Sequence, residues 1–450
     1  MYFSIRLNKP AFLQVCTGLF LMQCSGFSSA ITELDISAYS NTEYTSNARR
    51  VTTDTKNDVI ERLGLEVRLS EERKRFDANA NFRLEQEYYL NDTFSEQTNL
   101  TTGFGLFNFD IVEDFLDWRT SFTRTQTLSD PAEANTPDNR EERNVLRTGP
   151  AISYRINPNS LFRFSTNFVQ VENSDDTTAD TKRIDGKASY SYQFNSITQF
   201  SLNGNYDEII ESDVDDPLQP DVDDEIRNIS LYLGMNRQFH RGNLSINAGQ
   251  NQVRSDTRET VSGNFFNVAL ERDQVLSHHL FLNYSESISD SSIGFTTLED
   301  LLVTNPDPNA PTDLENASSL DIIKRKRFDV GITRDIETFQ YSVNAFWTDL
   351  NYEIQASDER SSGLTVSGRQ RMQESWTAGV SYQQMRQNFI DRPLDGKSTT
   401  HTYRVETDYR WTQNFSTNGF IAYEQRQNDD NFLREYEEFS VGLGLKIILY

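Results

Sequence analysis

Apolar and polar residues alternate along most of this chain, from about residue 33 to its last residues. The segment 76–88 is the clearest case: even positions carry residues such as Phe82 and Leu84, and odd positions carry residues such as Arg83 and Glu85. Successive side chains of a β-strand point to opposite faces, so such a segment has one apolar face and one charged face. A chain built from many of them is typical of a transmembrane β-barrel, apolar toward lipid and polar toward the lumen.

About 20 such segments can be counted, and most exceed the ~10 residues that a tilted strand needs to cross a membrane. Two weak segments, near 34–44 and 363–372, leave 18 strands as the alternative. We therefore predict an all-β fold, a single transmembrane antiparallel up-and-down β-barrel of about 18–20 strands. A soluble β-sandwich or propeller is the competing interpretation, but its strands would be near ~5–6 residues long.

Short and long connections alternate along the whole sequence. The short ones carry strong turn residues, as in Asn157-Pro158-Asn159-Ser160. The long ones lie near 45–57, 127–143, 207–226 and 288–320. In outer-membrane barrels the short turns are periplasmic and the long loops extracellular, which would place both termini in the periplasm.

The N-terminus has the pattern of a secretory signal peptide. Arg6 and Lys9 precede an apolar run at 11–24, and the small residues of 28–30 follow it. We predict a signal peptide at 1–30 and an outer-membrane β-barrel at 31–450.

Both cysteines of the chain, Cys16 and Cys24, lie in that signal. Disulfides, zinc-thiolate sites and cysteine nucleophiles are therefore excluded from the mature chain. Lipidation of Cys24 is an alternative, but it needs a small residue before the cysteine, and Gln23 stands there.

Composition limits the class and the partners of the protein. Hydrophobic residues make up 36%, which excludes a helical membrane protein, and 30 Phe and 19 Tyr argue against disorder. The net charge of -25 argues against nucleic acid as a partner. The expected partners are outer-membrane lipid and lipopolysaccharide, together with the outer-membrane assembly machinery, because the chain ends on aromatic Tyr450. The expected location is the cell outer membrane.

An acidic cluster occupies the long connection near 207–226. Dense carboxylates suit Ca²⁺, which takes about 6–8 oxygen ligands, but the segment lacks EF-hand spacing and a central glycine. A solvated outer loop is the preferred interpretation, and the weak calcium candidates are Asp213, Asp215, Asp216, Asp221, Asp223 and Asp224.

Basic side chains recur at polar positions of the alternating segments, mixed with Asp and Glu. They are expected either to form cross-strand ion pairs that stiffen the wall or to line a pathway selective for anionic solutes. The lumen-lining candidates are Arg62, Arg68, Arg75, Arg83, Arg119, Arg155 and Arg163.

Catalytic constellations are weak. The four histidines are His240, His278, His279 and His401, and none is placed beside a carboxylate or serine toward the outer face. We predict no enzyme activity and no cofactor.

The chain resembles the outer-membrane β-barrel proteins found with exopolysaccharide and PEP-CTERM sorting systems. The likeness begins at Tyr39–Asn47 (YSNTEYTSN), similar to the family's Y-T-D-N opening with Ser46 in place of its Asp. It continues through 59–69 and 76–88 and spans nearly the whole mature chain. The resemblance implies a role in moving a polysaccharide across the outer membrane, with polysaccharide and periplasmic export components as partners. It implies no catalytic residues.

Three functions follow as hypotheses. The first is a conduit or accessory for exopolysaccharide export. The second is a general diffusion porin for small solutes, and the third is a structural or adhesive surface barrel with a closed lumen. In the first, the 288–320 loop, stiffened by Pro306, Pro308 and Pro311, is the expected plug or lid.

Overall fold

The computed structural model describes most of the mature chain. It covers residues 33–129, 133–174, 180–213, 226–255, 259–273, 278–290, 322–353, 358–390, 396–429 and 435–449. The predicted signal at 1–30 and Tyr450 therefore lie outside the described residues.

Twenty strands account for nearly all of the described chain. Their bounds are β1 Glu33–Thr45, β2 Asp58–Arg73, β3 Phe76–Tyr89, β4 Gln97–Val112, β5 Leu116–Leu128, β6 Arg140–Asn157, β7 Ser160–Asn173, β8 Asp180–Asn195, β9 Thr198–Asp213, β10 Ile226–Phe239, β11 Gly242–Ser255, β12 Val261–Asp273, β13 His278–Asp290, β14 Ile322–Ile336, β15 Phe339–Tyr352, β16 Glu359–Gln373, β17 Trp376–Phe389, β18 Gly396–Arg410, β19 Phe415–Asn428 and β20 Tyr436–Ile448. The two weak segments are strands β1 and β16, so the count is 20.

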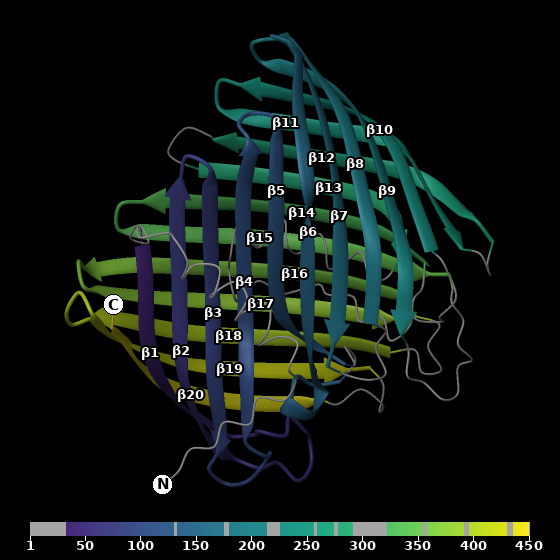
Figure 1. Cartoon of the computed structure of the whole chain (residues 1–450). Helices are drawn as coiled ribbons and strands as arrows, with labels where there is room; N and C mark the ends of the chain where they lie inside the picture. The colour runs from purple at the N-terminus through teal and green to yellow at the C-terminus, as the bar shows by residue number, and fades with distance from the viewer. Residues whose placement is uncertain are drawn as a thin grey trace.

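Each strand pairs antiparallel with the next one along the chain, and β1 pairs with β20 to close the barrel. The closing register runs from Ser37↔Ile448 to Thr45↔Ser440. Figure 1 shows the front strands β1–β9 crossing the back strands at a steep angle, as tilted strands of a barrel must. The prediction of a single antiparallel up-and-down barrel is confirmed.

Large apolar side chains cover the outside of the barrel. Leu231, Leu233 and Leu443 are 60%, 66% and 60% exposed, although they belong to the apolar stripes of their strands. Exposed side chains of this kind are stable only against lipid, because a water-facing apolar band of this extent would drive aggregation. Trp376 and Trp411 stand near strand ends on the same face, like an interfacial girdle.

The connections alternate in length, which defines two ends of the barrel. The connections from β2 to β3, from β4 to β5 and every second one thereafter have two to four residues, and we call this side the short-turn end. The others have five to 31 residues and define the long-loop end. Glu33 and Ile448 both lie at the short-turn end, since β1 starts there and β20 finishes there. The only other described element is the short 3-10 turn Pro137–Asn139.

No helix among the described residues is long and apolar enough to cross a membrane.

Candidate functional site: the lumen wall

The polar rows of the strands face the lumen, and most of the candidate arginines lie in them. Arg62 and Arg68 on β2 and Arg83 on β3 share the lumen-facing register, because Arg62 lies opposite Glu87 and Arg83 lies opposite Glu66. By the same alternation Arg119 on β5, Arg155 on β6 and Arg163 on β7 occupy lumen-facing positions of their strands.

Arg75 is an exception among the predicted lumen-lining arginines. It lies in the two-residue connection between β2 and β3, where its backbone oxygen accepts a hydrogen bond from Asp110. A tight hairpin turn takes its residues out of the alternation of the strands. Arg75 therefore stands at the rim of the short-turn end instead of on the wall.

Most of these cations are paired with carboxylates. Arg62 bridges Glu43 at 2.6 Å and Glu87 at 3.0 Å, on the strands to either side of it. Arg68 lies 2.6 Å from Glu66, whose other contact is Lys446 at 2.7 Å across the β1–β20 closure. Pairing of this kind ties neighbouring strands together and cancels charge, so this part of the wall fits the ion-pair network that the sequence predicts.

Three cations differ from the rest. Arg155, Arg163 and Lys187 are exposed on adjacent strands β6, β7 and β8, toward the short-turn end. Within the described part of the chain, none of them has an ion pair with a carboxylate. They form a basic strip, which is the part of the wall that fits the alternative of anion selectivity.

Aromatic rings lie against the inside of the wall, each over a glycine. Phe420 on β19 covers Gly442 on β20, and the Arg404 guanidinium stands 3.9 Å from its ring centre. Phe346 on β15 repeats the arrangement over Gly363, with Arg327 at 5.6 Å. Tyr39 on β1 lies over Gly64, with Arg83 at 4.4 Å.

In each case the arginine also pairs with a carboxylate two residues on, as Arg83 does with Glu85 at 2.8 Å. The others are Arg327 with Asp329 and Arg404 with Glu406. Each cation is thus held between a ring and a carboxylate, which adds a cation–π contact worth ~0.5–2 kcal/mol. Sequence reasoning missed these rings. The available signal was an aromatic residue in the polar register of its strand, opposite a glycine of the next strand.

The calcium candidates are not brought together by the described structure. Asp213 is the last residue of β9, and Asp215, Asp216, Asp221, Asp223 and Asp224 lie outside the described residues. Among the residues that are described, no group of three or more His, Cys, Asp or Glu is arranged to hold a metal ion.

Three of the histidines contact side chains on other strands. His278 Nε2 lies 2.8 Å from the Tyr341 hydroxyl, His279 Nδ1 lies 2.9 Å from Asp273, and His401 Nδ1 lies 3.0 Å from the Tyr382 hydroxyl.

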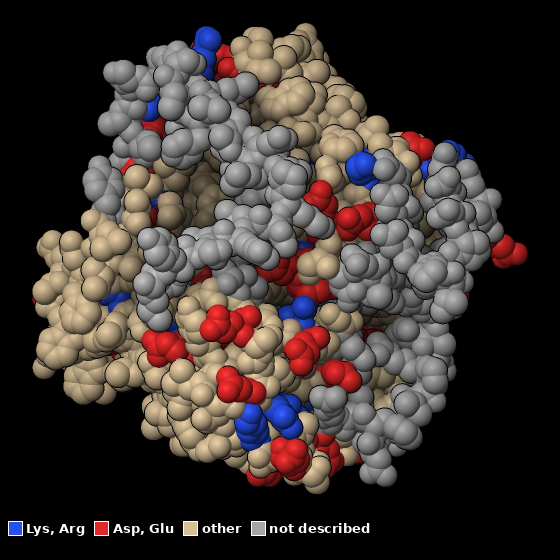
Figure 2. Space-filling model, turned by 60° about the horizontal axis from the view of Figure 1, so that its bottom comes forward, with Lys and Arg blue, Asp and Glu red and all other residues tan. Residues whose placement is uncertain are grey.

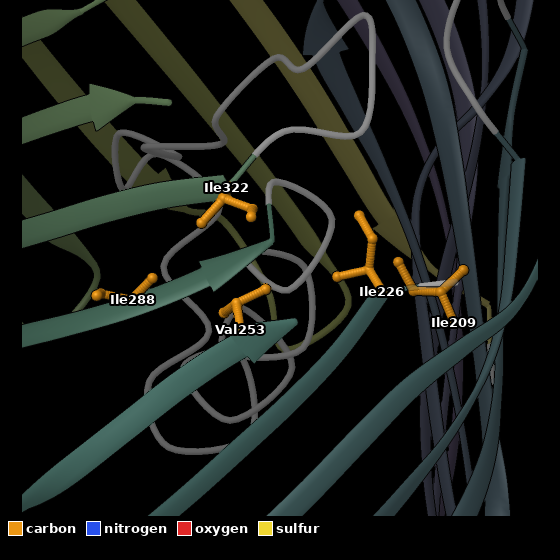
Figure 3. Packing of buried hydrophobic residues seen from close by; sticks show 5 residues of the cluster. All are labelled: Ile209, Ile226, Val253, Ile288 and Ile322. Atoms are coloured by element: carbon orange, nitrogen blue, oxygen red, sulfur yellow. The ribbon is translucent and has the colours of Figure 1, made fainter. Parts of the chain in front are cut away.

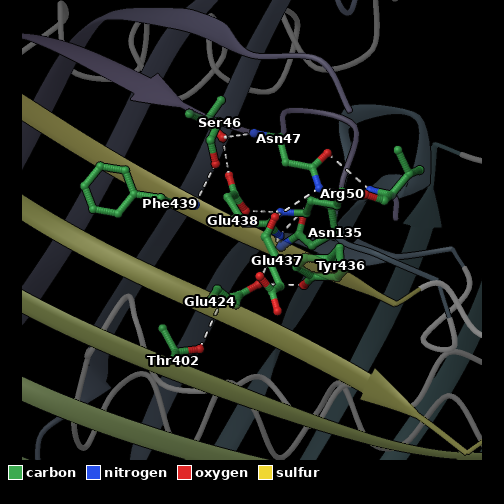
Figure 4. Close-up of polar contacts among 12 residues, drawn as sticks. Ser46, Asn47, Arg50, Asn135, Thr402, Glu424, Tyr436, Glu437, Glu438 and Phe439 are labelled. Carbon is green, nitrogen blue, oxygen red and sulfur yellow. Dashed lines mark hydrogen bonds and ion pairs between the residues drawn. The ribbon is translucent and has the colours of Figure 1, made fainter. Parts of the chain in front are cut away.

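A polar cluster joins the β1–β2 connection to the closing seam at the long-loop end (Figure 4). Arg50 donates from Nε to Glu438 at 2.7 Å and from Nη1 to the Asn135 carbonyl at 3.1 Å. Burial lowers the pKa of Arg50, but Glu424 and Glu438 outweigh it and raise that pKa above its ordinary value. The Tyr436 hydroxyl donates to Glu424 at 2.6 Å. Arg50 therefore stays a cation and binds three segments that are remote in sequence.

The β5–β6 connection reaches across the mouth of the barrel. Arg426 on β19 donates to the Glu133 carbonyl at 3.0 Å, although β20 and β1–β4 separate β19 from β5 around the wall. Ala134, Thr136 and Asn139 of the same connection are buried. Residues 133–139 therefore form an inward-folded segment at the long-loop end. The predicted lid, 288–320, falls outside the described residues except for Ile288–Asp290.

Charged side chains of both signs gather around the same end. Figure 2, turned so that the bottom of Figure 1 comes forward, shows Asp and Glu clusters with Lys and Arg beside them.

Apolar residues interrupt the polar lining near the long-loop end. Ile209, Ile226, Val253, Ile288 and Ile322 gather at the ends of β9, β10, β11, β13 and β14, and each is at most 4% exposed (Figure 3). Ile209 lies on the opposite face of β9 from Ile210, which is 48% exposed to the outside. A second buried cluster, Val145, Val169 and Val171, lies on β6 and β7. The alternation predicts polar residues on the lumen face, and these buried apolar positions depart from that pattern.

Comparison with known proteins assigns no family to the chain. No family model matches the sequence, and no curated protein matches it. Among solved structures, the siderophore receptor PiuA of Acinetobacter baumannii is 8% identical, with a TM-score of 0.47 over 93% of this chain and 82% of that one. OccD3 of Pseudomonas aeruginosa is 10% identical, with a TM-score of 0.37 over 95% and 94%. The siderophore receptor PirA of Pseudomonas aeruginosa is 11% identical, with a TM-score of 0.44 over 93% and 81%. At these identities the likeness is one of fold alone.

The closed wall, the lipid-compatible outer face and the hydrophilic inner rows define the class. The chain is an outer-membrane β-barrel with 20 antiparallel strands.

Proposed function

We propose that this barrel is a passive conduit across the outer membrane and that it serves exopolysaccharide export. The observation that carries the proposal is a closed 20-stranded wall whose inner rows are hydrophilic through most of their length. Barrels of 16–18 strands already leave an aqueous channel, so a wider one has room for a hydrated polymer.

The contacts inside the barrel support transport of a solute through the lumen better than catalysis. The cations at Arg62 and Arg68 are matched by carboxylates, which leaves a polar wall without a strong net field along that side. Among the described residues, His278 and His401 lie beside tyrosine hydroxyls and His279 lies beside Asp273.

Single-channel conductance of the refolded mature barrel in planar bilayers tests the proposal. We expect a large conductance that neutral or acidic oligosaccharides reduce. Conductance that is indifferent to sugar polymers would favour the general porin. An absence of current would overturn the conduit and favour the structural barrel.

A further inference from the structure

The inner wall from β9 to β13 carries no Asp, Glu, Lys, Arg or His side chain over four consecutive register rows. The strand pairing places these rows side by side. Their members are Asn205, Ser230, Asn251 and Gly263; Asn203, Tyr232, Gly249 and Phe265; Ser201, Gly234, Asn247, Asn267 and Ser285; and Gln199, Asn236, Ser245, Ala269 and Asn283. We call this surface the amide wall.

Asparagine dominates the amide wall, and most of its side chains are half-buried. Each amide offers two N–H donors and one acceptor oxygen, and it carries no charge. Some of this capacity is used locally, since Asn203 Nδ2 donates to Ser201 Oγ at 2.8 Å. The surface as a whole presents both donors and acceptors to the lumen.

Two aromatic rings stand in the middle of the amide wall. Tyr232 on β10 and Phe265 on β12 stack with ring centroids 4.4 Å apart and an interplanar angle of 28°. Gly249 on β11 lies in register with both of them. A β-carbon on Gly249 would overlap the backbone of β10, so the absence of a side chain permits the close approach of the strands beneath the rings. Unlike Phe346 and Phe420, neither ring lies under an arginine in the cation–π contacts described above.

The amide wall contrasts with the wall formed by β18–β20 and β1–β3. There the lumen-facing rows carry paired charges such as Arg62 with Glu43 and Arg404 with Glu406. The lining of the lumen therefore varies around the barrel, with paired charges on β18–β20 and β1–β3, the basic strip on β6–β8, and hydrogen-bonding groups without charge on the amide wall.

We infer that the amide wall is the contact surface for an uncharged, hydroxyl-rich chain, that is, a neutral glycan. Hydroxyl groups both donate and accept, as the asparagine amides do, and the apolar face of a sugar ring packs on aromatic rings. Within the amide wall an anionic chain would lose hydration without meeting a compensating charge, because the basic strip begins beyond it, at Lys187 on β8. This inference rests on the proposed conduit and names its substrate class.

Binding is tested directly, so that the answer does not depend on an open lumen. Isothermal titration of the refolded mature barrel, in a detergent without a sugar headgroup, compares isomaltohexaose with hexagalacturonate. We expect the neutral hexamer to bind more tightly than the anionic one in the barrel whose basic strip is removed by Arg155→Gln, Arg163→Gln and Lys187→Gln, since anions could otherwise bind to that strip. No binding of isomaltohexaose, or tighter binding of hexagalacturonate by that variant, would overturn the inference. Conductance decides the proposed function separately.

Matched variants locate the contact. Asn247→Asp and Phe265→Leu should each weaken binding of isomaltohexaose by about 2- to 10-fold, the value of one lost hydrogen bond or ring contact. Asn79→Asp and Phe420→Leu make the same changes on the wall formed by β18–β20 and β1–β3 and should leave binding unchanged. Asn203→Asp replaces Asn247→Asp if the latter does not fold, as judged by heat-modifiable gel mobility. Equal losses in both sets would overturn the assignment to the amide wall.

Discussion

At the scale of single residues, partner geometry decides which charges matter. Arg62 and Arg68 are two positions of the same β2 row, yet the Arg62 side chain is 22% exposed and touches two carboxylates, whereas Arg68 is 57% exposed. The sequence gives both residues the same register, and only their surroundings separate them.

Arg62→Met should therefore destabilise the barrel by about 2–3 kcal/mol. The largely buried carboxylates of Glu43 and Glu87 would both lose the guanidinium that neutralises them. Arg68→Met is the matched control and should cost less than ~1 kcal/mol, as exposed pairs do. Urea unfolding in lipid vesicles, followed by tryptophan fluorescence, measures both. Equal losses would contradict the role assigned to Arg62.

The ring-over-glycine contact gives a second prediction at this scale. Gly442→Ala places a β-carbon where the Phe420 ring lies, so the ring must leave Arg404, and we expect a loss of about 1–3 kcal/mol. Gly419→Ala, one strand away on the outer face, meets its nearest atom at 3.6 Å and should be nearly neutral. The same unfolding assay compares them, and a neutral Gly442→Ala would refute the packing argument.

At the scale of elements, the outer connections do more than join strands. Residues 133–139 and the β1–β2 connection meet at Arg50, and both are bound to inward-facing groups of β19 and β20. These contacts are few and polar, so a single substitution should be enough to weaken the attachment of residues 133–139 to the wall.

Arg50→Gln should release the inward-folded segment and raise both mean conductance and current flicker. Loss of hydrogen bonds to a charged group, about 1.5–3 kcal/mol, would shift an open-to-closed ratio by roughly tenfold or more. Arg49→Gln is the control, because the ion pair of Arg49 among the described residues is with Asp54, which is 91% exposed. Identical traces for the two variants would show that residues 133–139 do not restrict the mouth.

At the scale of the whole molecule, the position of the charges should matter more for ion selectivity than the net charge. The chain is strongly acidic, with a net charge of -25, but the lumen carries the basic strip on β6–β8. Permeant ions respond to the charges lining their path more than to distant loops, which salt screens within about 8 Å at physiological ionic strength.

The triple variant Arg155→Gln, Arg163→Gln and Lys187→Gln should therefore shift the reversal potential in a salt gradient toward cations. Conversion of three outer-face positions to other neutral residues, such as Leu231→Val, Leu233→Val and Val380→Ala, should leave it unchanged. A reversal potential unaffected by loss of the strip would show that these side chains lie away from the ion path.

The sequence by itself determined the architecture and the facing of each strand. Alternation has a period of two, and a strand pairs with its chain neighbour through a short turn, so register and sidedness follow from local order. The segments around β1 and β16 were weak because the former is short of large apolar residues and the latter holds Gly363 and Gly368. Their strand neighbours on both sides nevertheless fix them in the wall.

Only the tertiary structure decided which residues meet inside the barrel. Closure brings Lys446 to Glu66 and Arg50 to Glu438, pairs separated by almost the whole chain. Strand stagger aligns Asn203, Tyr232, Gly249 and Phe265 into one row, although they lie on four strands. Local patterns set which face a side chain takes, whereas the shear of the closed barrel sets its height and its neighbours, and that quantity is a property of the whole wall.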